Sequence, residues 1–156
     1  MEKVKTVFIS KSAKSTQTFA KSLAKKIRPG DILALYGSLG AGKTTFVQGL
    51  AAGLGYKARV FSPTFIFVRP YKLANSKQQT ANSNKRKIKI LYHIDLYRVE
   101  KETDLKTIGI EEFLTDNDAV SVIEWPEKIE NKLPIKTIKI KIEVISENER
   151  RIKVDG

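Results

Sequence analysis

The sequence contains no cysteine among its 156 residues. Disulfide bonds, thiolate metal sites and cysteine nucleophiles are therefore excluded. His93 is the single histidine, and one imidazole cannot hold zinc without further nitrogen or sulfur ligands. Any metal bound by this chain must consequently be a hard cation that is held by oxygen atoms.

Long apolar runs are also missing, since no stretch approaches the about 18 consecutive apolar residues that a membrane helix requires. The first residues alternate lysine with apolar side chains instead of forming the apolar core of a signal peptide. A cytoplasmic protein without membrane association is expected. The length is that of one ordinary domain, so residues 1–156 are predicted to form a single domain.

Acidic residues are scarce relative to basic ones, and the formal net charge is +12. Residues 91–125 contain nine acids and three bases, a local charge of −6, so the remainder carries +18. This segregation favours either attraction of a polyanion or an acidic partner, or simply a lysine-rich solvated surface. Residues 72–89 hold six bases and no acid, and they are predicted to form a basic loop or an extended hairpin insertion.

Hydrophobic periodicity predicts strands that alternate with helices. Helices are expected over residues 12–28 and 43–54, and the continuous apolar run 31–36 predicts a strand covered on both faces. Further strands are predicted at 60–61, 64–68, 88–95, 119–123, 135–145 and 150–154, with one helix containing Leu105, Ile108 and Phe113. This order predicts an α/β fold of the P-loop NTPase type. Its mostly parallel sheet is flanked by helices, with antiparallel edge strands that include a C-terminal hairpin.

Residues 37–44, GSLGAGKT, match the phosphate-binding pattern G-x-x-x-x-G-K-[ST] between a predicted strand and a predicted helix. Average composition gives roughly 0.005 chance matches in a chain of this length. Backbone N–H groups of such a loop and the first turn of the helix attract phosphate. Lys43 is predicted to contact the β and γ phosphates of ATP, and the Thr44 hydroxyl to bind Mg²⁺. The loop residues predicted to bind nucleotide are Ser38, Leu39, Gly40, Ala41, Gly42, Lys43 and Thr44.

Two acidic residues end predicted strands, Asp95 after 88–94 and Glu124 after 119–123. A loop that binds Mg²⁺ through one hydroxyl needs a carboxylate at the carboxyl end of a neighbouring strand. Both acids are therefore candidates for metal binding, directly or through water, or for orienting the attacking water. Asp95, Glu124 and Lys43 are the predicted catalytic residues.

Other polar and aromatic residues near these acids leave two interpretations open. Thr64 follows a Ser-Pro turn and is either a switch residue that responds to the γ-phosphate or an ordinary turn residue. His93 shares a strand face with Asp95 and either takes part in the site or is a hydrogen-bonded core residue. Packing is the expected role of Tyr97 and Trp125.

The segments GSLGAGKTTF, SPTF, YHIDLYR, DLKTIGIEEFL and VIEWPEK occur in this order. With them the chain resembles the TsaE (YjeE) family, P-loop ATPases of bacterial tRNA threonylcarbamoyladenosine biosynthesis. The resemblance implies a weak, partner-dependent ATPase that acts with the TsaD and TsaB proteins and does not itself transfer the threonylcarbamoyl group. Contact with tRNA is expected to be indirect or to involve the basic surface.

The resemblance also implies roles for individual residues. Thr44 and Glu124 match Mg²⁺ ligands of the family, and Asp95 matches its catalytic or metal-orienting acid. The residues implied to line the nucleotide site are Thr45 and Trp125, with Thr16 and Arg150 near the base and ribose. Two departures stand out: residues 72–89 are longer and more basic than the family hairpin, and Glu149 stands where relatives often have glycine.

Three other functions are compatible with a phosphate-binding loop. A small-molecule kinase would need an arginine-bearing lid, but residues 72–89 contain a single arginine. A GTPase would need Asn-Lys-x-Asp, and neither Asn-Lys pair of the sequence is followed by it. A nucleotide-sensing module, in which ATP changes the shape of residues 62–71, remains an alternative to a hydrolytic enzyme.

Overall fold

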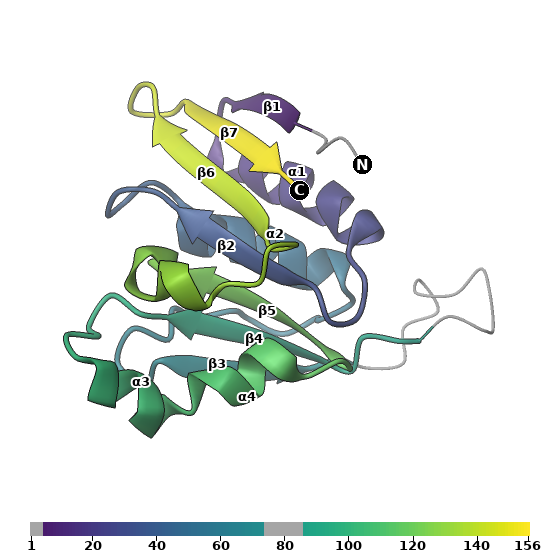
Figure 1. Ribbon diagram of the computed structural model, residues 1–156. Helices are drawn as coiled ribbons and strands as arrows, with labels where there is room; N and C mark the ends of the chain where they lie inside the picture. The colour runs from purple at the N-terminus through teal and green to yellow at the C-terminus, as the bar shows by residue number, and fades with distance from the viewer. Residues whose placement is uncertain (1–4, 74–85) are drawn as a thin grey trace.

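Segments rich in β-branched and aromatic residues form a single seven-stranded sheet in the computed structural model, which describes residues 5–73 and 86–156 (Figure 1). The strands are β1 (Lys5–Ser10), β2 (Ile32–Tyr36), β3 (Val68–Lys72), β4 (Ile90–Asp95), β5 (Ala119–Glu124), β6 (Ile138–Val144) and β7 (Arg150–Asp155), in the spatial order β1-β7-β6-β2-β5-β4-β3. Strands β6, β2, β5 and β4 run parallel. The β1–β7, β6–β7 and β3–β4 pairs are antiparallel, so the predicted fold class is confirmed.

Helices cover both faces of this sheet. They are α1 (Ala13–Leu23), the short 3₁₀ helix η1 (Ala24–Lys26), α2 (Lys43–Gly53), α3 (Glu102–Ile108), α4 (Ile110–Thr115) and the 3₁₀ helix η3 (Pro126–Lys132). Successive residues of a strand point to opposite faces, and two separate cores result. In β2, Leu33 and Leu35 pack with α1 and α2, whereas Ile32 packs with α3, α4 and η3.

Helix α1 lies across α2 at close range. Ser12 caps α1 by accepting a hydrogen bond from the Ser15 N–H, which satisfies one of the free donors at the helix start. Phe19 of α1 stacks on Phe8 of β1 with ring centroids 4.5 Å apart. At the crossing, α2 presents Gly49 to the backbone of α1, so the absence of a side chain there permits the close approach.

The structure corrects the prediction of strands at 60–61 and 64–68. Residues 64–67 form turns, and β3 begins only at Val68. The Pro63 carbonyl accepts hydrogen bonds from the N–H groups of Ile66 and Phe67, which closes the chain into a turn. The β-prone composition of this segment concealed that local pairing.

Several element boundaries also differ from the prediction. The single helix predicted around Leu105 is divided into α3 and α4 at Gly109, whose φ of 74° ends a helix. The first helix ends at Leu23 and continues only as η1. Strand β6 pairs antiparallel with β7 as predicted, but it also pairs parallel with β2. No prediction covers β1, although its run Val7-Phe8-Ile9 has high β propensity.

The predicted basic insertion at 72–89 lies largely outside the described residues. Its described ends pair with each other, because Lys72 faces Ile90 in the β3–β4 ladder and the Leu73 N–H donates to the Lys89 carbonyl. In the part of the chain that is described, no helix has the length and apolarity to cross a membrane.

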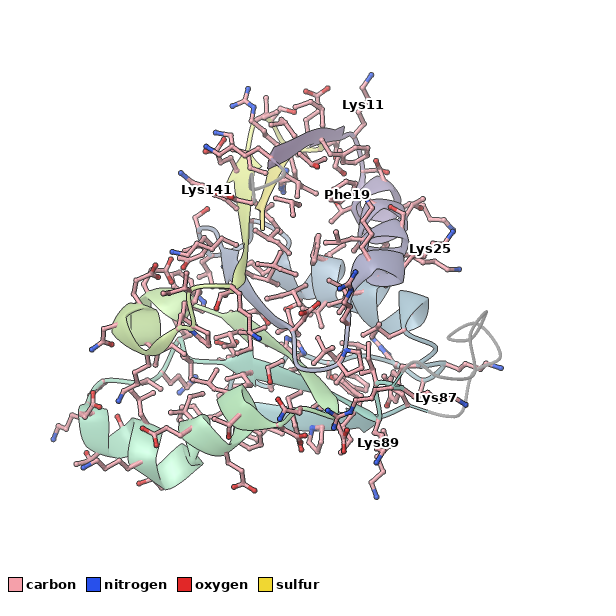
Figure 2. All side chains as sticks on the ribbon, turned by 45° about the vertical axis from the view of Figure 1, so that its right-hand side comes forward. Lys11, Phe19, Lys25, Lys87, Lys89 and Lys141 are labelled. Atoms are coloured by element: carbon pink, nitrogen blue, oxygen red, sulfur yellow. The ribbon has the colours of Figure 1, made fainter. Side chains whose placement is uncertain are left out.

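The lysine-rich surface is not gathered on one face. The labelled lysines extend outward from several sides of the molecule, from the turn before α1 and from η1, from the segment before β4, and from β6 (Figure 2). Lys25, Lys89 and Lys141 are all exposed. For these residues, a solvated surface explains the basic composition without a binding partner.

Gly49→Ala should destabilise the fold. A Cβ atom at this position would lie 2.3 Å from the Gln17 carbonyl oxygen, so α1 must move even though alanine is the better helix former. Overpacking of this kind predicts a net loss of about 2 kcal/mol in the free energy of unfolding, measured by urea denaturation. Ala52→Ser, on the exposed side of α2, is the control and should change stability little. Equal stability of the two variants would contradict the close α1–α2 contact.

Candidate functional site

The two strand-end acids are brought together by the parallel register of the sheet. Asp95 of β4 is paired with Glu124 of β5, and Glu124 is also paired with Leu35 of β2. All three residues point to the α2 face, because they alternate in step with strand residues that pack against α2. Glu124 therefore meets Thr44 at the end of the loop that joins β2 to α2, and Asp95 lies beside Glu124 on the neighbouring strand. Both are almost completely buried.

The predicted phosphate-binding loop has the backbone of a tight turn. Gly40 and Gly42 adopt positive φ values of 79° and 101°, which residues with side chains rarely adopt. Gly42 immediately precedes α2, so the first N–H groups of this helix, including those of Lys43, Thr44 and Thr45, have no partners within the helix. Such donors at a helix start are suited to an anion.

The Lys43 ammonium is held inside the loop. Its Nζ donates to the carbonyls of Gly37 at 2.7 Å and Ser38 at 2.9 Å, and it lies 4.3 Å from the centre of the Trp125 ring. Burial lowers the pKa of Lys43 from its ordinary value, while the negative charges of Glu124 and Asp95 act in the opposite direction. The ammonium is thus aimed across the loop before any ligand binds.

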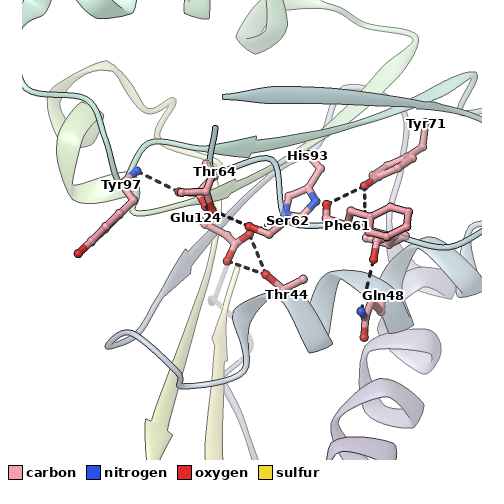
Figure 3. Close-up of polar contacts among 11 residues, drawn as sticks. Thr44, Gln48, Phe61, Ser62, Thr64, Tyr71, His93, Tyr97 and Glu124 are labelled. Carbon is pink, nitrogen blue, oxygen red and sulfur yellow. Dashed lines mark hydrogen bonds and ion pairs between the residues drawn. The ribbon is translucent and has the colours of Figure 1, made fainter. Parts of the chain in front are cut away.

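Glu124 connects α2 to the sheet interior (Figure 3). Its two carboxylate oxygens each lie 3.4 Å from the Thr44 hydroxyl, and Oε2 lies 2.6 Å from Nε2 of the fully buried His93. The Glu124 carboxylate accepts this hydrogen bond in the His93 tautomer that carries its hydrogen on Nε2. His93 is therefore a hydrogen-bonded core residue, as one of the two interpretations holds, and its partner is Glu124, so a part in the site's chemistry stays a prediction.

Asp95 is bound to the turn that precedes β3. The Thr64 hydroxyl donates to Oδ2 of Asp95 at 2.8 Å, and the hydroxyl groups of Ser62 and Thr64 lie 2.7 Å apart. The other carboxylate oxygen accepts the Tyr97 N–H at 2.9 Å. The backbone N–H of Asp95 also donates to the Phe67 carbonyl at 2.8 Å. Residues 62–67 and the strand-end acid consequently form one hydrogen-bonded unit.

Trp125 takes an unusual backbone conformation directly after β5. Its φ of 58° lies in the left-handed region, and Pro126 then begins η3. This turn brings the indole over Lys43 and within 5.1 Å of the Tyr97 ring centre. The expectation of packing for both aromatic residues is confirmed, and Trp125 also lies beside the loop.

Arg150 of β7 reaches the loop, and Thr16 of α1 lies against the neighbouring strand β1. The Arg150 Nε donates to the Ala41 carbonyl at 3.0 Å, which ties β7 directly to the loop. Thr16 is buried, and its hydroxyl lies 2.7 Å from that of Ser10, which is paired with Arg150 across the β1–β7 ladder. Contact of these two residues with a base or ribose stays a prediction.

Of the remaining loop residues, Ala41 is buried in the core and the others lie at the surface. Ser38 and Gly40 are exposed, and Leu39 is 74% exposed at the tip of the loop. Thr45 is half-buried in the first turn of α2. In such a loop, a phosphate is bound by the backbone N–H groups and not by the side chains of these residues.

The oxygen atoms at the site fit a magnesium ion better than they fit a transition metal. Among residues 5–73 and 86–156, no cluster of three His, Asp or Glu side chains could hold a metal by itself. Mg²⁺ characteristically takes one or two protein oxygens and completes its shell with water and substrate phosphate. Neighbouring ligands around Mg²⁺ are about 3 Å apart, from bonds of about 2.1 Å at right angles. The 3.4 Å between Thr44 and Glu124 oxygens is close to that spacing.

A cavity of about 710 Å³ borders the other side of the loop. Gly37, Ser38 and Trp125 contribute to it, together with lysines of β1, β6 and β7. Neither Thr44 nor the two acids line it, so it is distinct from the predicted phosphate and metal position.

Some residues of the site carry no strong sequence signal. Ser10 supports Thr16, and Tyr71 exchanges hydrogen bonds with the backbone of Phe61, whose N–H donates at 3.2 Å and whose carbonyl accepts at 3.0 Å (Figure 3). Gln48 of α2 donates to the Val60 carbonyl at 3.4 Å. These contacts join segments far apart in the sequence, which periodicity cannot reveal.

Comparisons with known proteins agree with this geometry. The family described as "Threonylcarbamoyl adenosine biosynthesis protein TsaE" matches residues 10–152. The "tRNA threonylcarbamoyladenosine biosynthesis protein TsaE" of Bacillus subtilis is 37% identical over 137 residues, 88% of this chain and 77% of that protein. The protein of the same name from Treponema pallidum is 34% identical over 146 residues, 94% of this chain and 97% of that protein. A crystal structure of Bacillus subtilis YdiB superposes with a TM-score of 0.75 at 30% identity, covering 100% of this chain and 88% of that one.

Sheet order, loop and strand-end acids define a P-loop NTPase-like α/β protein. Within that class, the match over residues 10–152 and the two bacterial relatives decide the family. The chain belongs to the TsaE family of tRNA threonylcarbamoyladenosine biosynthesis proteins.

The His93–Glu124 contact should appear as coupling in a double-mutant cycle. Hydrogen bonds to charged groups contribute about 1.5–3 kcal/mol, so the stability changes of His93→Asn and Glu124→Gln should fail to add by about 1 kcal/mol or more. The measurement is urea denaturation of the wild type, both single variants and the double variant. Glu130→Gln combined with His93→Asn is the control and should be additive, because Glu130 bonds Lys139 and Tyr36 instead. Additivity of both pairs would show that His93 does not hold Glu124.

Proposed function

We propose that the chain is a cytoplasmic, Mg²⁺-dependent subunit that binds and hydrolyses ATP and is required for threonylcarbamoyladenosine modification of tRNA. It acts with the TsaD and TsaB proteins to drive or reset the transferase complex, and it does not perform the transfer. Contact with tRNA is indirect or through the basic surface. The observation that carries this proposal is the meeting of Thr44, the last residue of the loop, with Glu124 at the end of β5.

Each group at the site has a defined role in this proposal. The loop N–H groups and the start of α2 bind the phosphates of ATP, and Lys43 adds a positive charge that reaches the β and γ phosphates. Thr44 and Glu124 hold Mg²⁺, which when bound neutralises charge that develops on the phosphate oxygens. Glu124 is in turn oriented by His93.

Asp95 orients the attacking water, directly or through the metal shell. Its carboxylate is fixed by the Thr64 hydroxyl and the Tyr97 N–H, so it is held in place independently of Glu124. The rate of phosphoryl transfer depends mainly on how well the reacting groups are positioned and how well the charge of the transition state is stabilised. The reaction is therefore slow when Asp95 or another of these side chains is not in its catalytic position. A partner that adjusts residues 62–67 would then increase the rate.

Glu124→Gln and Asp95→Asn should each lower ATP hydrolysis by about 100-fold, because each removes a negative charge that holds metal or orients water. The rate is measured as phosphate release with purified TsaD and TsaB present. Glu111→Gln is the matched control, since Glu111 is exposed on α4, which packs on the opposite face of the sheet from α2. If both acid variants kept the full partner-dependent rate, the hydrolytic mechanism would be wrong. Turnover that ignored TsaD and TsaB but rose with a small acceptor molecule would favour a kinase.

Lys43→Ala should weaken ATP binding by about 10- to 100-fold, which corresponds to the loss of a charged hydrogen-bonding group. Binding is measured by isothermal titration calorimetry with ATP and Mg²⁺, and the affinity of the wild type should fall when Mg²⁺ is chelated. Lys25→Ala serves as control, because Lys25 is exposed in η1 and does not line the cavity beside the loop. Unchanged ATP affinity in Lys43→Ala would place the phosphates elsewhere.

A further inference from the structure

Large apolar side chains gather at the surface beside Asp95. Phe65 is 78% exposed, Ile66 54% and Phe61 48%, and all three belong to the segment before β3. Monomeric proteins seldom expose such side chains together unless they meet a partner. We call these three residues, with Arg59, Arg69 and Arg98, the Phe65 surface.

The exposure of these side chains is imposed by an ordered backbone. Both the N–H and the carbonyl of Phe61 are bound by the Tyr71 hydroxyl, and the Pro63 carbonyl accepts from Ile66 and Phe67. Phe67 has a φ of 64°, a conformation that costs energy in an aromatic residue. Such local strain is typical of functional segments. The turn therefore holds Phe65 and Ile66 outward.

Guanidinium groups surround the exposed rings. Arg98 lies 4.3 Å from the centre of the Phe65 ring. Arg59 and Arg69 lie 5.0 and 5.7 Å from the Phe61 ring. None of the ion pairs formed within residues 5–73 and 86–156 includes any of these three arginines. Their charges are therefore available to a carboxylate brought by another molecule.

We propose that the Phe65 surface is the docking site for a protein partner that presents an apolar pocket bordered by carboxylates. Phe65 and Ile66 would fill the pocket, and Arg98 with Arg59 and Arg69 would pair with the acids around it. Exposed aromatic residues and arginine are enriched at protein interfaces and dominate their binding energy. This inference rests on the proposed function, in which the TsaD–TsaB pair is the partner.

The docking site adjoins the proposed chemistry. Thr64 lies between Phe61 and Phe65 in the sequence, and its hydroxyl donates to Asp95. A partner that moves the Phe65 surface therefore acts on the carboxylate that orients water. This link gives a physical reason for hydrolysis that depends on a partner.

A protein fits this surface better than single-stranded RNA does. Bases stack on open ring faces, whereas here guanidinium groups already lie over the rings of Phe61 and Phe65. Ile66 is aliphatic and offers no face for stacking. The chain is rich in lysine, yet the charges on this surface are arginines, which protein interfaces favour over lysine.

The test measures binding of the full chain to the purified TsaD–TsaB pair by titration calorimetry. Phe65→Ala and Arg98→Glu should each weaken binding by about tenfold or more, as expected for residues that dominate an interface. Ile135→Ala and Arg28→Glu are matched controls. Both residues are exposed and lie near the amino ends of β6 and β2, away from Asp95, and they should change the affinity less than about twofold.

ATP binding by each variant and its basal ATP hydrolysis are measured without partners. Both should equal those of the wild type, because the exposed side chains of Phe65 and Arg98 contact neither the loop nor Asp95, which is bonded by Thr64, Tyr97 and Phe67 instead. Wild-type affinity for TsaD–TsaB in Phe65→Ala and Arg98→Glu would overturn the inference, as would a wild type that does not bind the pair. Loss of binding to a tRNA transcript with intact binding to TsaD–TsaB would overturn it in favour of RNA. Failure of the proposed function is distinguishable, since it would appear as a wild type that binds TsaD–TsaB but does not hydrolyse ATP even with both proteins present.

Discussion

The parallel register of β4, β5 and β2 is the constraint on which the site depends. It pairs Asp95 with Glu124 and Glu124 with Leu35, so both acids end their strands at the same level. A slip of one residue would turn an acid to the opposite face of the sheet. The two buried cores prevent this, because alternate apolar residues on β2 and β5 must face α2 on one side and α3 with α4 on the other. The burial of apolar side chains in the two cores thus supplies the free energy that keeps the Asp95 and Glu124 side chains on the α2 face of the sheet.

The parts of this arrangement with local causes were predictable from sequence. The loop is encoded by glycines at fixed spacing, α2 by its helical period, and the strand-end acids by their place after apolar runs. The turns at 64–67 were harder to predict from the sequence. Phe65, Ile66 and Phe67 have β propensity, but hydrogen bonds to the Pro63 carbonyl close the chain into a turn. The positive φ of Trp125 and the bond between His93 and Glu124 arise from tertiary packing, which no local pattern encodes.

Hydrogen bonds join the predicted site to its surroundings in two directions. On one side, Arg150 of β7 binds the Ala41 carbonyl, and Ser10 links Thr16 to the paired β1 and β7 strands. On the other side, Thr64 binds Asp95. The loop is therefore supported by the sheet edge, while one acid is connected to an exposed turn. In the proposed function, such a site would combine a rigid place for phosphates with a water-orienting group that a docked protein could reach.

The central claim is that residues 37–44 hold ATP while Thr44 and Glu124 hold its magnesium ion. A crystal structure of the chain with a non-hydrolysable ATP analogue and Mg²⁺ tests it most directly. The phosphates should lie against the loop N–H groups, with the Thr44 hydroxyl about 2.1 Å from the metal and Glu124 bound to it directly or through one water. Phosphates bound away from the loop, or a metal shell with neither Thr44 nor Glu124 in it, would contradict the claim.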